Sequence, residues 1–173
     1  MFGRVRAPKA LRSLLEPGER LLAVADGEPA GDHRALLAAT VRGLLLPGED
    51  GWRHVSWSTV VKATWDAAGL EVVEGTADEH GVVTDRPPVR YRLTEPRNLP
   101  VVVRQRVERS IARQEQVRVP GGTARVIARR RPGVDGLHWT ARLDSGTPDT
   151  PDVRQALAGY LDRVREQQAD LSA

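Results

Sequence analysis

The chain of 173 residues contains no cysteine, and this absence excludes several kinds of site at once. Without thiols there are no disulfide bonds, no thiolate-liganded zinc sites and no cysteine nucleophiles. No apolar run approaches the roughly 20 residues that cross a bilayer as a helix. Residues 1–15 include basic side chains but lack the central apolar stretch of a secretory signal. We therefore expect a soluble, cytoplasmic protein that does not bind a membrane.

Lysine and aromatic residues are also scarce. Aromatic residues make up 4% of the chain, and 24 of the 26 basic residues are arginine. The abundance of arginine, alanine, valine and glycine is typical of codon usage in a GC-rich genome. It also fits a surface selected for bidentate contacts with phosphate or carboxylate groups. Composition alone leaves both interpretations open.

The net charge of +3 conceals a segregation of charge along the chain. Residues 97–131 carry ten basic and two acidic side chains, a net charge of +8. Residues 21–96 have a net charge of −5, and residues 132–173 have −3. The basic segment therefore either attracts an anionic partner or is neutralised by acidic segments of the same chain.

Alternating and helical hydrophobic patterns follow one another along the chain. Helices are expected at residues 9–15, 99–114 and from 150 to about 167, the last with Thr150 as its cap and Pro151 in its first turn. The segment 75–88 is interpreted as a loop because it is rich in Gly, Asp, Glu and Pro. Strands are expected at residues 20–25, 34–40, 43–46, 52–57, 60–66, 70–74, 89–93, 117–119, 123–129 and 137–143.

This order of elements predicts a β-rich α+β fold. We expect a small antiparallel barrel that is capped by a helix with Val103, Val107 and Ile111 turned inward. A three-stranded sheet and a C-terminal helix follow it. The expected divisions are an N-terminal arm at 1–18, the barrel with its helix at 19–114, and a β-β-β-α unit at 115–173.

Four sequence segments carry a family resemblance. They are Glu19-Arg20-Leu21-Leu22, Thr40-Val41-Arg42-Gly43-Leu44-Leu45-Leu46, His54-Val55-Ser56-Trp57 with Val60, and Trp65-Asp66 before Leu70-Glu71-Val72. With the strand order, they make residues 19–114 resemble bacterial pleckstrin-homology-like domains. The resemblance implies a binding scaffold and no particular reaction. Lipid binding is not implied, because the loop after the first strand carries Asp26, Glu28 and Asp32, which would repel an anionic headgroup.

The C-terminal part has a weaker, purely topological likeness. With the preceding helix it has the α-β-β-β-α order of double-stranded-RNA-binding domains, but it has no lysine-rich helix start. The arginines of this part are the candidate contacts to nucleic acid or another anionic partner, since like charges on neighbouring strands are unfavourable unless an anion intervenes. Neutralisation within the chain is the alternative. The candidates are Arg118, Arg125, Arg129, Arg130, Arg131 and Arg142, with His138 beside them.

The four tryptophans are the other candidates for special roles. Trp57, Trp65 and Trp139 are expected in the core, because large rings dominate cores that otherwise contain Val, Leu and Ala. Trp52, next to a hairpin tip, is the candidate for an exposed contact with a protein partner.

The sequence contains no recognisable catalytic or cofactor-binding pattern. The four histidines are scattered, so no metal site is expected. No serine sits in a nucleophile elbow, and Gly121-Gly122 lacks the lysine and helix of a phosphate loop. We therefore expect a non-enzymatic protein without a cofactor that acts as a protein-interaction or scaffold module. The alternative is binding of nucleic acid or another anionic partner through residues 97–131.

Overall fold

The computed structural model describes residues 8–28, 36–48, 51–67 and 69–170. The chain forms two compact units. The first comprises the chain up to Glu74 together with Pro87–Arg109, and the second comprises Gly75–Arg86 together with the chain from Ser110 onward. Residues 1–7 of the expected arm and Asp32 of the acidic loop lie outside the described residues.

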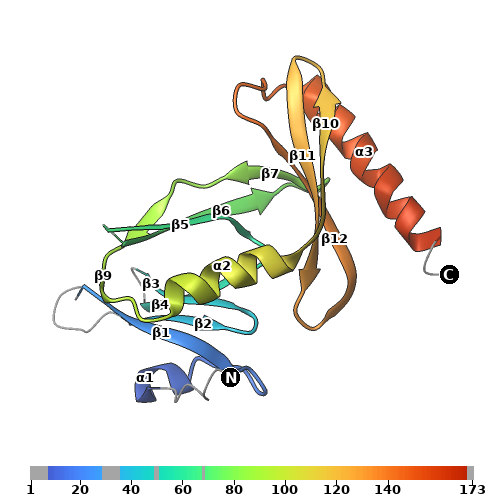
Figure 1. Cartoon of the computed structure of the whole chain (residues 1–173). Coiled ribbons are helices and arrows are strands. Elements are labelled where there is room, and N and C mark those ends of the chain that lie inside the picture. The colour runs from blue at the N-terminus through green and yellow to red at the C-terminus, as the bar shows by residue number, and fades with distance from the viewer. Residues whose placement is uncertain (1–7, 29–35, 49–50, 68, 171–173) are drawn as a thin grey trace. The chain divides into compact units, whose positions relative to one another are not determined.

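The first unit contains the elements predicted for the barrel (Figure 1). One antiparallel sheet has the order β4-β3-β2-β1-β9, and a second group of strands pairs β6 with β5 and β8. The bounds are α1 (Lys9–Arg12), β1 (Leu21–Gly27), β2 (Leu36–Thr40), β3 (Gly43–Gly48), β4 (Gly51–Ser56), β5 (Val60–Asp66), β6 (Gly69–Ala77), β8 (Val89–Tyr91), β9 (Leu93–Glu95) and α2 (Leu99–Ser110).

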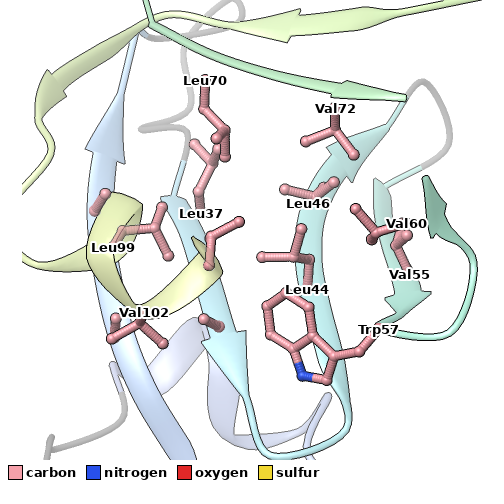
Figure 2. Packing of buried hydrophobic residues seen from close by; sticks show 14 residues of the cluster. Leu37, Leu44, Leu46, Val55, Trp57, Val60, Leu70, Val72, Leu99 and Val102 are labelled. Carbon is pink, nitrogen blue, oxygen red and sulfur yellow. The ribbon is translucent and has the colours of Figure 1, made fainter. Parts of the chain in front are cut away.

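Helix α2 packs its apolar side into the core of the first unit (Figure 2). Leu99, Val102 and Val103 are buried there beside leucines of β2 and β3, and Val107 packs against the same cluster. The predicted inward face of this helix is confirmed for Val103 and Val107. Ile111 is different, because α2 ends at Ser110 and Ile111 begins a strand. Apolar and polar residues alternate from Val117 to Val119, which favours a strand in the later part of this segment.

The second unit is a sheet covered on one face by a helix (Figure 1). Strands β10, β11 and β12 pair in that order, and β7 pairs in parallel with β12. The final residues of β6, Gly75–Ala77, pair with β7. The bounds are β7 (Val82–Asp85), β10 (Ile111–Val119), β11 (Gly122–Arg131), β12 (Val134–Leu143) and α3 (Pro151–Asp170).

Helix α3 forms where the sequence predicts it. Thr150 Oγ1 accepts a hydrogen bond from the Val153 N–H at 3.4 Å, which caps the first turn. Val153, Leu157 and Leu161 recur every four residues and are fully buried against the sheet.

The tight turn before β11 uses Gly121 at φ +76°, where a side chain would also meet Pro148. The α+β fold and the C-terminal helix are therefore confirmed, and the three predicted strands are present, but β7 extends their sheet in parallel beyond β12.

Besides the end of α2, two local predictions are wrong. The segment 75–88 is not a loop, because β6 continues to Ala77 and β7 follows at Val82–Asp85. β7 pairs with a strand almost 60 residues later in the sequence, and such distant pairing leaves little local signal. Val89, expected to point into the core, is 42% exposed on the three-residue strand β8.

Candidate functional site

The predicted arginines lie on the sheet of the second unit. Strands β11 and β12 place Arg125 directly opposite Arg142 and Arg129 opposite His138. These residues alternate with the small apolar residues that pack under α3, so they belong to the opposite face. The structure therefore places Arg125 beside Arg142, and Arg129 beside His138, on this face.

Carboxylates from the same unit neutralise two of these arginines. Arg125 Nε lies 3.1 Å from Asp144 Oδ1. Arg142 donates to both carboxylate oxygens of Asp85, with 2.7 Å between Nε and Oδ1. Hydrogen bonds from Gln116 and Thr123, with the charge of Arg125, lower the pKa of Asp144. The positive charge at this position is therefore largely compensated within the unit.

Two further candidates have neutral partners. Arg129 is 5% exposed, and its Nη1 donates to Ser110 Oγ at 2.6 Å. Arg131 Nη2 lies 2.5 Å from His138 Nε2. Burial and the charges of Arg131 and Arg165 lower the pKa of His138, which favours the neutral ring that accepts this hydrogen bond.

Arg118 and Arg130 remain exposed, with no carboxylate within 4 Å in the part of the chain that the structure describes. The two arginines are separated along the sheet. Arg118 on β10 lies opposite Thr123 near the start of β11, whereas Arg130 lies near the end of β11. The six predicted arginines thus form a mixture of paired, buried and separate side chains.

The tryptophans divide differently from the prediction. Trp57 and Trp139 are buried, as expected. Trp65 is 41% exposed at the end of β5, so its prediction is wrong. Alternation along a strand shows to which face of the sheet a side chain points. Whether that face is covered at a given position depends on which other elements pack against the strand there. Trp52 is half-buried against a small cluster that includes Leu11.

A groove of about 590 Å³ lies between α3 and the sheet. Its apolar part contains Trp139, Tyr160 and Val164. Tyr160 OH donates to Glu115 Oε1 at 2.9 Å, and Trp139 Nε1 donates to Gln168 Oε1 at 2.5 Å. These two contacts join α3 to β10 and β12. The lining residues are Arg113, Gln114, Glu115, Leu137, Trp139, Tyr160, Val164, Gln167 and Gln168.

The groove also reaches the edge of the sheet. Among the strands that the structure describes, β10 pairs with β11 alone. Arg113, Gln114 and Glu115 are consecutive residues of β10, and all three line the groove. Neighbouring strand residues point to opposite faces. The groove therefore borders β10, which is an edge strand of this sheet.

The sequence patterns did not predict this groove. Tyr160, Val164 and Gln168 follow one another every four residues on α3, which is the signal that could have indicated one lining wall. Tyr160 and Val164 are both half-buried on this stripe of α3. Which strand meets this stripe depends on the tertiary structure.

No protein-family model, curated protein or solved structure matches this chain. The resemblance to pleckstrin-homology-like domains therefore stays a prediction. Within the described ranges, no three His, Asp or Glu side chains come together in a way that would hold a metal ion. The described helices also include none with the length and apolarity needed to cross a membrane.

Proposed function

We propose that this protein is a non-enzymatic interaction module that binds an extended segment of a protein partner along β10. The observation that carries the proposal is the groove that borders this edge strand. An extended peptide that adds to a sheet edge gains main-chain hydrogen bonds, and adjacent pockets select its side chains. The groove and the edge together offer both kinds of contact.

The regular part of the β10 edge supports this proposal. Exposed sheet edges are normally protected by proline, charged side chains (above all lysine), bulges or covering segments. The bulge of β10 lies between Ile111 and Arg113, and Pro120 comes only after the strand ends. Residues 113–119 contain neither proline nor lysine, and their register with β11 is regular. Their charged side chains are Arg113, Glu115 and Arg118, which a strand of complementary charge could pair with. Seven residues are thus available as a template for another strand.

The lining of the groove suits the side chains of such a strand. Leu137, Trp139 and Val164 offer apolar surface, while Gln114 and Gln167 provide polar groups at the same site. Aromatic and apolar surface combined with a few polar groups is typical of binding sites for peptides and small ligands. Alternate side chains of an added strand would point toward this surface.

The nucleic-acid alternative has less support. Phosphate binding requires cations that are accessible to the ligand. Arg125 and Arg142 are already paired with carboxylates, and Arg129 is buried. We therefore favour a protein partner.

The proposal can be tested with the whole chain as bait in a selection of displayed random peptides. We expect the selected peptides to bind the wild-type chain in solution. They should not bind the Val164→Glu variant, which places a charge in the groove. Val101→Glu is the matched control, because Val101 is 54% exposed on α2 of the first unit.

Backbone N-methylation of a selected peptide provides the sharper measurement. In an added strand, the amides of alternate residues donate to β10 and the others point away. Methylation of one alternating set should therefore abolish binding, whereas methylation of the other set should be tolerated. Equal effects of the two sets would contradict strand addition.

A further inference from the structure

The edge of β10 carries a distinct arrangement of charge. Arg113 and Arg118 are exposed and have no carboxylate within 4 Å in the described part of the chain. They are five residues apart, an odd separation, so within the regular stretch of β10 their side chains point to opposite faces of the sheet. A strand added to this edge would meet one uncompensated cation on each face.

The remaining charges near the groove differ from these two arginines. Glu115 lies on the groove side, but its carboxylate already accepts the hydroxyl of Tyr160. The Arg163 guanidinium lies 5.5 Å from the centre of the Tyr160 ring, which adds positive charge to this wall. The site as a whole therefore favours acidic over basic side chains in an occupant.

The β10 register then assigns each position of an antiparallel occupant. Directly opposite residues of paired strands share one face of the sheet. Residues opposite Val117 and Val119 would be apolar, and the residue opposite Glu115 would be uncharged. Residues opposite Arg118 and Arg113 would be acidic, because only these positions adjoin the uncompensated cations.

We propose that the partner segment is an acidic strand, antiparallel to β10, with two carboxylates five residues apart opposite Arg118 and Arg113. The inference rests on the proposed function and adds the chemistry of the partner. From its N-terminal end, opposite residues 119 to 113 of β10 in turn, the side chains of the segment are apolar, acidic, apolar, polar, uncharged, polar and acidic. The two carboxylates lie on opposite faces of the extended sheet.

The probe is a fluorescent peptide whose core is valine, glutamate, valine, threonine, leucine, threonine and glutamate, flanked by glycine and serine. Its binding to the whole chain is followed by fluorescence anisotropy. We expect it to bind about tenfold more tightly than the same peptide with lysine at both glutamate positions, because two exposed ion pairs contribute roughly 1–2 kcal/mol together. The difference should shrink at high salt concentration.

Charge reversal on the protein tests each position separately. Arg113→Glu should weaken binding of the original peptide and strengthen binding of a peptide with lysine only at the last core position. Arg118→Glu should do the same for lysine at the second position. Arg104→Glu is the control for reversal of a surface charge elsewhere, because Arg104 is an exposed arginine on α2 of the first unit, where it pairs with Glu108.

Each outcome bears on a defined proposal. Equal binding of the acidic and lysine peptides, or reversal without the matching change in preference, overturns the acidic partner. If peptides from the display selection still show the alternating N-methylation pattern, the proposed function stands without this inference. If no peptide shows that pattern, both are wrong. Displacement of the peptide by a single-stranded oligonucleotide at equal concentration would overturn the inference in favour of nucleic acid.

Discussion

Arg125 on β11 and Arg142 on β12 lie directly opposite each other, and each forms an ion pair with a different aspartate. Like charges that face each other across two strands are destabilising. Asp144 follows the end of β12, and Asp85 ends β7, so two segments bring one carboxylate to each arginine. The arginine pair is thus tolerated because of the surrounding structure of the second unit.

Removal of one carboxylate should expose the repulsion between the two arginines. We expect Asp85→Asn to lower the free energy of unfolding by less than about 1 kcal/mol, because the pair is partly exposed to solvent. Urea unfolding at low and high salt measures the effect, and the loss should be smaller in high salt. In an Arg142→Gln background the same substitution should have little effect. An equal loss in both backgrounds would contradict the pairing.

A buried carboxylate in the first unit gives a second prediction. Thr40 Oγ1 donates to Glu19 Oε1 at 2.5 Å and accepts the N–H groups of Arg42 and Gly43. Thr40→Val should destabilise this unit by about 1–3 kcal/mol, because it leaves buried polar groups without their partner. Thr40→Ser keeps the hydroxyl and should cost less. Chemical denaturation of the three proteins provides the measurement, and equal losses for Val and Ser would show that the hydroxyl does not matter.

The same carboxylate is linked to acid stability. Burial alone would raise the pKa of Glu19, but hydrogen bonds from Thr40 and the Glu16 N–H, together with the contact to His54, lower it below its ordinary value of 4.5. A lowered carboxyl pKa contributes stability above that value, and the contribution is lost as the pH falls below it.

His138 gives a prediction in a separate pH range. Its pKa lies below the ordinary value of 6.5 because of burial and the charges of Arg131 and Arg165. The unfolded chain therefore takes up a proton at this residue at a higher pH than the folded chain does. Stability from this residue is present above pH 6.5 and decreases as the pH falls below it. The His138→Gln variant should show a flatter decrease in unfolding free energy between pH 7.5 and 5, measured by urea unfolding. Parallel curves for variant and wild type would contradict the shift.

Several features could be predicted from local patterns. Pro120-Gly121 and Pro132-Gly133 are turn sequences, and apolar and polar residues alternate in 137–143, so the hairpins of the second unit have local signals. Val153, Leu157 and Leu161 recur every four residues, which is a local signal of α3 and of its buried side. These signals are local, because a turn or an apolar stripe is encoded by residues close together in the chain.

The candidate site was predicted less well than the fold. The arginine segment was identified, but its pairing with Asp85 brings together residues 57 positions apart. Strand β7, the exposure of Trp65 and the groove likewise depend on which elements become neighbours. The charge pattern permitted neutralisation within the chain and binding of an anion equally, since it contains no information about distance.

By itself, the sequence determined the class of fold, the principal hairpins, the inward sides of α2 and α3, and the absence of thiol chemistry. Only the tertiary structure decided which arginines are compensated and that the β10 edge adjoins a groove under α3. The physical reason is that periodicity follows from the geometry of one strand or helix. Electrostatic compensation and surface shape arise from contacts between residues that are far apart along the chain.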